Sequence, residues 1–248
     1  MRTLAAALTL AVLTTVLGGV VLLAQLFGVP DGPGTIYERA PRWWARAILA
    51  ASGIRVVLHG AERARTGEPR VFACNHVSWY DVLVLVAHLP RYSFVAKREL
   101  FRVPVFGAAA RAVGTIPIDR DNRMAAFHSY EEAAARIREG RSVVVFPEGT
   151  RGERYALRPF KKGPFVLAIA AGVPIVPTLV HGTREALPRG SLWLRAGRVD
   201  VHFLEPVATA GLGYDARDAL SARVHDRLAD ELRDCYGVPT ADAAPAAA

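Results

Sequence analysis

The sequence predicts an α/β fold, a mixed and partly parallel sheet flanked by helices, preceded by an N-terminal hydrophobic and amphipathic helical membrane anchor. Three observations predict this fold. Short runs rich in valine and isoleucine alternate with helical segments along most of the 248 residues. Some runs, such as 143–146, are apolar at every position, as is typical of parallel strands buried on both faces. The chain also begins with a long segment that is almost wholly apolar.

This N-terminal segment, residues 4–27, carries no charge and is long enough to cross a bilayer as a helix. Arg2 precedes it and a group of arginines at 39–46 follows it, which favours the cytoplasmic side of the cell membrane for the downstream chain. A cleaved signal peptide is the alternative. We favour a retained anchor because the run is long for a signal peptide and lacks a convincing Ala-x-Ala cleavage site.

Residues 36–54 predict a second helix with an apolar side that includes Trp43 and Trp44. Arginines lie between the apolar positions, and adjacent tryptophans beside a basic face are typical of a helix at a membrane interface. A helix packed into the core of the domain is the alternative, because amphipathicity does not separate the two. We predict membrane-anchoring helices over 1–54, an α/β domain over 55–237 and a disordered Ala/Pro-rich tail over 238–248.

Within the α/β domain, strands and helices alternate. The candidate strands are residues 55–59, 71–75, 93–96, 115–118, 142–146, 175–181, 192–195 and 198–204. The expected helices lie near residues 80–89, 104–112, 123–139 and 163–171. A final amphipathic helix at about 215–236 carries apolar residues four positions apart and stops at Gly237.

The composition favours anionic partners and a reducing compartment. The 31 Lys and Arg exceed the 23 Asp and Glu, and the net charge of +8 suits phosphate groups, an anionic lipid surface or nucleic acid. A mean hydropathy of +0.20 points to membrane contact or an apolar substrate. The two cysteines, Cys74 and Cys235, form neither a metal-ligand spacing nor a disulfide framework.

We expect the rest of the chain to be organised around the segment from Val71 to Asp81. An apolar run ends there in Asn75-His76, and Asp81 precedes the next apolar run. This pattern indicates a strand, a tight turn and a helix, with His76 at the carboxyl end of the strand, where ligands bind in open α/β sheets. An aspartate in the first helical turn can fix the tautomer of the imidazole and leave the other nitrogen free to take a proton. Alternatively, His76 caps the helix and Asp81 complements the helix dipole.

Other predicted strands are also followed by polar residues. Arg120 and Arg151 each come shortly after a short strand, and Lys97 follows another. Each arginine alone is more often a solvated surface charge. Together with His76, they predict one site for an anionic ligand beside a general base, because the guanidinium suits bidentate phosphate binding.

The turn that precedes Arg151 offers further groups to this site. Thr150 and the backbone N–H groups around Gly149 could add hydrogen-bond donors. Glu148 would repel a phosphate, so we expect it to orient Arg151 or to accept a hydrogen bond from a substrate hydroxyl.

Four ordered blocks of this sequence resemble those of the glycerolipid acyltransferase family. The blocks are Asn75-His76-x-Ser78-x-x-Asp81, Gly114-x-Ile116-x-Ile118-Asp119-Arg120, Phe146-Pro-Glu-Gly-Thr-Arg151 and Val173-Pro-Ile-Val-Pro177. The likeness is greatest to bacterial 1-acyl-sn-glycerol-3-phosphate acyltransferases and runs from about residue 55 to 207. Pro117 stands where the family often has an aromatic residue, and Gly152 stands where serine is common.

The resemblance implies a membrane-bound enzyme that moves a fatty acyl group to the sn-2 hydroxyl of lysophosphatidic acid, giving phosphatidic acid. It implies His76 as the general base and Asp81 as the residue that orients and stabilises its imidazole. The acceptor phosphate would be held by residues after the strands: Arg120, Glu148, Gly149, Thr150, Arg151 and Lys97. The donor would be acyl-CoA or acyl-carrier protein, with no covalent acyl-enzyme, no resident cofactor and no metal.

Other functions remain open. The same chemistry could act on another lysophospholipid or lyso-lipid, although two arginines favour a phosphate monoester. A hydrolase is disfavoured because the sequence has no Gly-x-Ser-x-Gly, His-Glu-x-x-His or Gly-Lys-Ser/Thr motif. A non-enzymatic basic protein that binds membranes is least favoured, and no nucleic-acid partner is expected because no nucleic-acid motif occurs.

Overall fold

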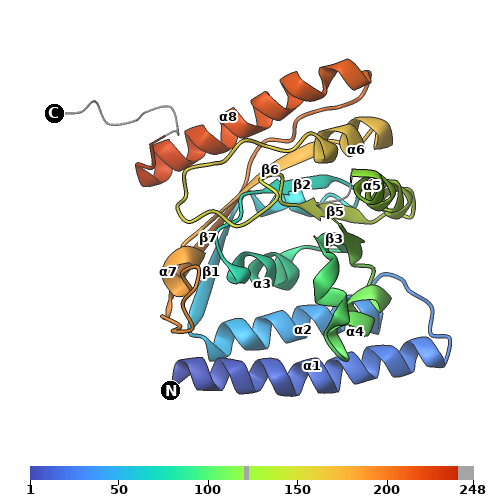
Figure 1. The fold of residues 1–248 in the computed structure, drawn as a ribbon, viewed down its shortest axis with the longest axis vertical. Helices are drawn as coiled ribbons and strands as arrows, with labels where there is room; N and C mark the ends of the chain where they lie inside the picture. Colours follow the sequence, from blue (N-terminus) through green and yellow to red (C-terminus); the bar gives the residue numbers. More distant parts are fainter. Residues whose placement is uncertain (120–122, 240–248) are drawn as a thin grey trace.

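A mixed sheet forms the centre of the molecule (Figure 1). The structure is a computed structural model that describes residues 1–119 and 123–239, and the side chains of all of these except 123–127. In that part of the chain, the strands are β1 (Ile54–His59), β2 (Val71–Cys74), β3 (Tyr92–Lys97), β4 (Ile116–Ile118), β5 (Ser142–Val145), β6 (Ile175–His181) and β7 (Gly197–Phe203). Their order in the sheet is β1-β7-β6-β2-β5-β3-β4.

Helices cover both faces of this sheet. They are α1 (Arg2–Leu26), α2 (Ile36–Ala51), α3 (Trp79–His88), α4 (Phe106–Ala112), α5 (Arg123–Arg138), α6 (Gly163–Ala171), α7 (Thr183–Ala186) and α8 (Arg217–Tyr236). Residues 1–119 and 123–239 also contain the short 3-10 helices η1 (Ala61–Ala64), η2 (Arg98–Arg102) and η3 (Tyr214–Ala216). The fold class expected from the sequence is therefore confirmed. The predicted tail over 238–248 lies outside the described residues from position 240 onward.

The direction of the strands places the carboxyl ends of five strands, and the loops that follow them, on one side of the sheet. β2 pairs in parallel with β5 and β6, and β3 pairs in parallel with β5 and β4. β7 runs antiparallel to β6, and β1 runs parallel to β7. The loops that follow β2, β3, β4, β5 and β6 therefore leave the same edge, where α/β folds commonly build their sites.

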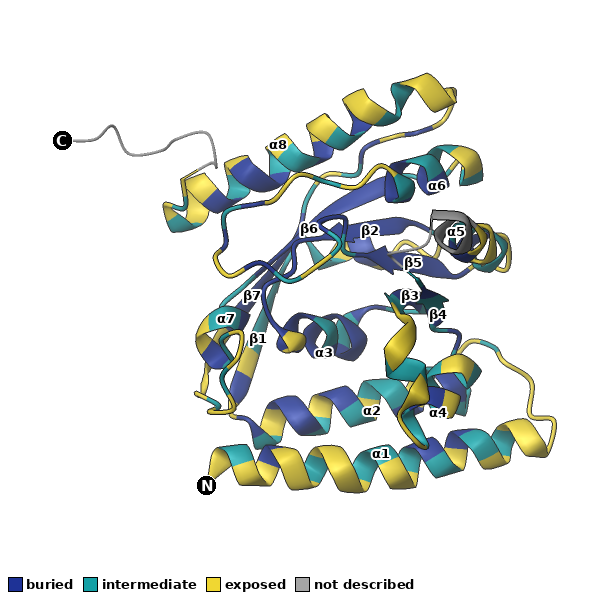
Figure 2. Ribbon diagram, viewed as in Figure 1, coloured by how far each residue is buried: buried dark blue, intermediate teal, exposed yellow. Residues whose placement is uncertain are grey.

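The apolar strands are buried on both faces because each face carries its own helices. In β2, Val71 and Ala73 belong to the cluster under α5, α6 and α8, whereas Phe72 and Cys74 belong to the cluster under α2 and α3. This alternation follows from the two-residue period of a strand. The central strands are accordingly buried throughout (Figure 2).

The predicted strand over 192–195 is wrong. This segment is a loop between α7 and β7, and its backbone bonds to groups outside the sheet. Arg195 N donates to Ala186 O at 2.9 Å, and Leu194 N donates to the Thr3 hydroxyl at 3.1 Å. Leu192 and Trp193 point outward and are 82% and 77% exposed. The apolar residues that predicted a strand are thus exposed in a loop and do not pair with a neighbouring strand.

The two N-terminal helices form a layer below α3 (Figure 1). α1 lies along α2, and Trp44 Nε1 of α2 donates to the Thr14 hydroxyl of α1 at 3.0 Å. On its other side, α2 buries Ala45 and Ile48 in the same cluster as the sheet. α2 therefore packs into the domain, the second of the two alternatives, while Trp43 stays 51% exposed.

Candidate active site

The turn after β2 is held by the side chain of Asn75. Its Nδ2 donates to Val180 O at 3.0 Å, and its Oδ1 accepts from Val180 N at 2.7 Å. The buried amide thus continues the pairing of β2 with β6 for one more position, after the backbone of β2 has turned away. This contact fixes where the next residue, His76, leaves the sheet.

His76 and Asp81 form a buried pair. His76 Nδ1 lies 2.8 Å from Asp81 Oδ2, and the two residues are 7% and 0% exposed. α3 begins at Trp79 with Ser78 as its N-cap, and Asp81 Oδ2 also accepts from Val77 N at 2.7 Å and Ser78 N at 2.8 Å. One carboxylate therefore caps the helix and holds the imidazole. His76 itself does not cap the helix, because Ser78 is the N-cap; the structure shows the other alternative, in which Asp81 contacts the imidazole.

This contact sets the chemistry of the imidazole. Because the Asp81 carboxylate accepts, the proton of a neutral His76 lies on Nδ1, so Nε2 carries the lone pair. Among the described residues, none hydrogen-bonds to Nε2. The ring also stacks on Phe146, with centroids 4.0 Å apart and planes inclined by 19°. His76 is thus held in one orientation with a nitrogen able to accept a proton.

Thr183 completes the environment of Asp81. This buried threonine follows β6 and begins α7, and its hydroxyl donates to Asp81 Oδ1. Both oxygens of a fully buried carboxylate are therefore satisfied, which offsets the cost of burying it. No sequence pattern indicated Thr183, because it lies 102 positions beyond Asp81 in the chain.

Glu148 connects the loop after β5 to the backbone of His76. Its Oε1 accepts from His76 N at 2.9 Å, and its Oε2 accepts from Arg158 N at 3.2 Å. In the same loop, Gly152 N donates to His76 O at 2.7 Å. The buried carboxylate therefore fixes the position of His76, and within the described residues it forms no pair with Arg151. Burial raises the pKa of Glu148 to about 7, although the two backbone hydrogen bonds act to lower it.

This raised pKa makes the stability of the fold depend on pH. Between the usual pKa of 4.5 and about 7, the folded chain binds more protons at Glu148 than the unfolded chain. The contribution of Glu148 to the free energy of unfolding therefore falls as the pH rises through this window. We expect Glu148→Gln to make the slope of the free energy of unfolding against pH shallower in this window, by the equivalent of up to one proton. Urea denaturation at several pH values measures this slope. Glu153→Gln, in the same loop but exposed, is the control, and an unchanged slope in Glu148→Gln would contradict the raised pKa of Glu148.

Arg151 presents a cation near the pair. Its guanidinium lies over the Trp79 ring, 4.7 Å from the centroid. Burial and the nearby Arg189 lower the pKa of Arg151, with Asp81 acting in the opposite direction. No carboxylate among the described residues forms an ion pair with it. A guanidinium that is oriented by an aromatic ring and lacks an anion suits an anionic ligand.

Of the other predicted site residues, Gly149 and Thr150 lie in the turn before Arg151, whereas Lys97 lies on a more distant strand. Gly149 has a φ of +75° and its N–H donates to Phe146 O in the turn before Arg151. Thr150 is exposed in the same turn. Lys97 lies two strands away from β2, where its Nζ forms a pair with Glu99 at 3.3 Å. The expected role of Arg120 lies outside the described residues.

Comparisons with known proteins assign the chain to a family. The family model described as Acyltransferase matches residues 55–181. The 1-acyl-sn-glycerol-3-phosphate acyltransferase of Haemophilus influenzae is 31% identical over 196 residues, covering 78% of this chain and 80% of that protein. The corresponding alpha enzyme of Ovis aries is 36% identical over 184 residues, covering 73% of this chain and 64% of that protein.

Two further comparisons bear on length and fold. The Cocos nucifera 1-acyl-sn-glycerol-3-phosphate acyltransferase is 32% identical over 166 residues, covering 66% of this chain, which spans 53% of the plant protein. The crystal structure of the 1-acyl-sn-glycerophosphate (LPA) acyltransferase PlsC from Thermotoga maritima has the same fold. Its TM-score is 0.75 at 24% identity, covering 94% of this chain and 98% of that chain. The matched family region contains His76, Asp81, Glu148 and Arg151, and the chain belongs to the acyltransferase family.

Proposed function

We propose that this protein is a 1-acylglycerol-3-phosphate O-acyltransferase, which acylates the sn-2 hydroxyl of lysophosphatidic acid to give phosphatidic acid. The observation that carries this proposal is the buried His76–Asp81 pair beside Arg151, which forms no ion pair within the described part of the chain. The relatives at 31% to 36% identity are named for this activity, which supports the same acceptor here. The donor is an acyl thioester, either acyl-CoA or acyl-carrier protein.

The tautomer of His76 determines which nitrogen acts as the base. Nε2 takes the proton of the acceptor hydroxyl while the hydroxyl oxygen attacks the thioester carbonyl. Asp81 stabilises the imidazolium that forms, as a carboxylate does in other histidine-based catalysts. The tetrahedral intermediate then collapses, the carbon–sulfur bond breaks, and the imidazolium returns the proton to the leaving thiolate. The acyl group passes directly to the acceptor and no acyl-enzyme forms.

Binding of the acceptor phosphate by Arg151 provides a direct test. We expect Arg151→Ala to raise the KM for lysophosphatidic acid by about 10- to 100-fold, since a hydrogen bond to a charged group contributes about 1.5–3 kcal/mol. The KM for acyl-CoA should change little. Steady-state formation of phosphatidic acid measures both constants.

Arg154→Ala is the matched control for this prediction. Arg154 is an exposed arginine in the same loop, so its removal tests whether positive charge alone accounts for the effect. Equal changes in the two variants, or an unchanged KM for lysophosphatidic acid in Arg151→Ala, would remove Arg151 from the phosphate site.

Membrane association completes the proposal. α1 is long and apolar enough to cross a membrane by length and composition. It lies lengthwise along α2 and leaves residues such as Leu8 and Val12 more than half exposed. Trp193 lies close to its first turn, where Leu194 N bonds to Thr3. We infer that this apolar surface lies within the cytoplasmic face of the cell membrane, where lysophosphatidic acid and acyl chains enter the site.

A charged residue in this surface should weaken the association. We expect Val12→Glu to lower the fraction of protein that co-sediments with phosphatidylglycerol-containing vesicles, because burying a carboxylate in lipid is costly. Ala170→Glu is the control, because Ala170 is an exposed residue of α6, a helix on the side of the sheet opposite α1 (Figure 1). Equal sedimentation of both variants and the wild type would place the contact elsewhere.

A further inference from the structure

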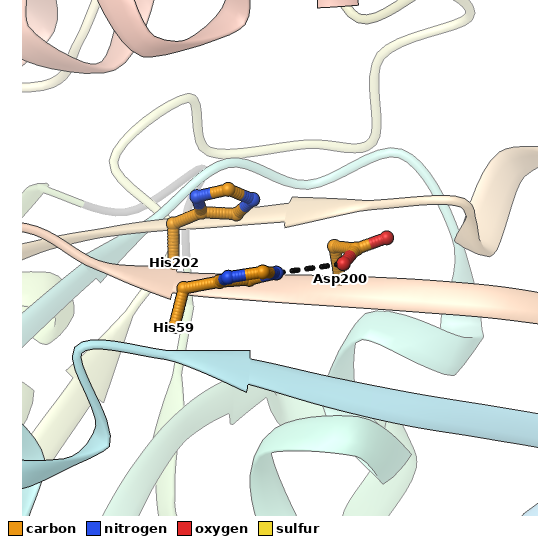
Figure 3. A group of neighbouring side chains, drawn as sticks. All are labelled: His59, Asp200 and His202. Carbon is orange, nitrogen blue, oxygen red and sulfur yellow. Dashed lines mark hydrogen bonds and ion pairs between the residues drawn. The ribbon is translucent and has the colours of Figure 1, made fainter. Parts of the chain in front are cut away.

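A group of metal-binding side chains lies away from the active site. It consists of His59 on β1 with Asp200 and His202 on β7, which we call the histidine cluster (Figure 3). His59 pairs with His202 in the parallel register of the two strands, and Asp200 lies two positions before His202. Side chains at such positions point to the same face of a sheet, here the face covered by α8.

The donor atoms of the cluster converge. A ring nitrogen of each histidine and an oxygen of Asp200 all lie within 4.8 Å of one another. His59 Nε2 is 2.7 Å from Asp200 Oδ1, and the two imidazoles stack with centroids 4.2 Å apart. Two imidazoles and one carboxylate are a donor set that suits Zn²⁺, with bonds of about 2.0–2.2 Å. Rotation of His59, whose side chain is 42% exposed, would splay the two rings and bring the donors to these distances.

A residue of α8 orients His202. Glu231 Oε1 lies 2.7 Å from His202 Nδ1, so this carboxylate fixes the tautomer and leaves the lone pair on Nε2. Nε2 now accepts a hydrogen bond from the Tyr236 hydroxyl at 2.7 Å, a donor that can rotate away. Metal ions bind the neutral form of imidazole through such a lone pair.

An arginine competes for the carboxylate of the cluster. Arg198 holds both oxygens of Asp200, with Nη2 at 2.6 Å from Oδ1 and Nε at 2.9 Å from Oδ2. The side chain of Arg198 is 52% exposed, so it can move into solvent when another cation replaces its contacts with Asp200. A divalent cation would take the place of this guanidinium as the counter-charge of Asp200.

We propose that His59, Asp200 and His202 form a Zn²⁺ site in which the ion displaces Arg198 from Asp200. The open side next to His59 admits the ion and a water as fourth ligand. Such an ion would connect the edge strand β1 to β7 and, through Glu231, to α8. The site would therefore stabilise the edge of the sheet. This inference is independent of the acyltransferase assignment, because no residue of the cluster belongs to the active site.

Zinc binding by the purified full-length protein tests the proposal, with Zn²⁺ alone as the probe in calorimetric titration at pH 7.5. We expect one ion per chain in the wild type and at least about 10-fold weaker binding in His59→Ala. His59 is half-exposed, so its removal leaves the core intact. Arg198→Gln should bind zinc several-fold more tightly than the wild type, because the competing cation is lost.

Two controls separate this site from others. His128→Ala removes an exposed histidine of α5 and should bind as the wild type does. Cys235→Ser should also leave the affinity unchanged, although Cys235 lies near Glu231 and His202. Zinc should raise the Tm of the wild type but not of His59→Ala. Absence of binding by the wild type, equal binding by His59→Ala, or loss of binding in Cys235→Ser would overturn the proposal.

Discussion

Replacement of His76 by alanine is expected to lower acyl transfer by about 10³-fold or more, because general-base catalysis contributes about 10²–10⁴ and His76 Nε2 is the base of the site. The fold should persist. The backbone bonds of His76 to Glu148 and Gly152 do not need the imidazole, and Asp81 keeps its three other donors. Steady-state transfer, thermal unfolding and vesicle binding measure the three properties separately.

The control for this variant is His128→Ala, which removes an exposed imidazole on α5. It should keep wild-type activity. If His76→Ala transferred acyl groups at the wild-type rate, His76 would not be the base. A loss of folding in His76→Ala would instead show that the stacking on Phe146 is needed for the structure of the loop.

Asp81→Asn is expected to cause the second largest loss, on the order of 10²- to 10⁴-fold in kcat. Hydrogen-bond donors converge on both carboxylate oxygens, from the His76 ring, two backbone amides and Thr183. An amide nitrogen in place of Oδ2 would face the His76 ring and two backbone N–H groups, so the imidazole would lose its fixed tautomer. In either orientation the neutral amide lacks the charge with which the carboxylate stabilises the imidazolium. The KM for the acceptor should change little, because Asp81 acts on His76 and not on the phosphate.

A milder variant separates the effect on His76 from a general loss of packing. Thr183→Val keeps the shape of the side chain and removes only the donor to Asp81 Oδ1, so we expect a loss of about 10-fold or less, in line with one hydrogen bond to a charged group. If Thr183→Val and Asp81→Asn lost equal activity and equal stability, the role of Asp81 would be structural. Urea denaturation and kcat, measured on the same preparations, distinguish the two results.

The local part of the site could be predicted from the sequence. An apolar run followed by His76, and Asp81 five positions later, predicts a strand, a turn and a helix with the two side chains in contact. The structure shows that contact at 2.8 Å. A short-range pattern of this kind depends on the backbone geometry of a few successive residues, so the surrounding fold has little influence on it.

The contacts that support His76 could not be predicted in this way. Glu148 lies 72 positions from His76, and Thr183 lies 102 positions from Asp81. These residues meet because β2, β5 and β6 are neighbours in the sheet, an order that periodicity does not encode. For the same reason, we expected Glu148 to orient Arg151 or to accept a hydrogen bond from a substrate hydroxyl, whereas its carboxylate accepts from two backbone amides.

Periodicity also left the role of α2 open. An apolar stripe beside arginines fits a membrane interface and a domain core equally well. Packing decides between them: Ala45 and Ile48 are buried under the sheet, and Arg46 Nε donates to Ala87 O at the end of α3. The exposed apolar surface belongs instead to α1 and to the loop that carries Trp193.

An acceptor panel tests the proposed acylation of lysophosphatidic acid. Purified protein is incubated with one acyl-CoA and, separately, with lysophosphatidic acid, lysophosphatidylcholine or no acceptor, and the lipids are identified by mass spectrometry. We expect rapid formation of phosphatidic acid from lysophosphatidic acid, little acylation of lysophosphatidylcholine and little free fatty acid without acceptor. Equal acylation of both lysolipids, release of fatty acid without acceptor, or the absence of any acylated product would contradict it.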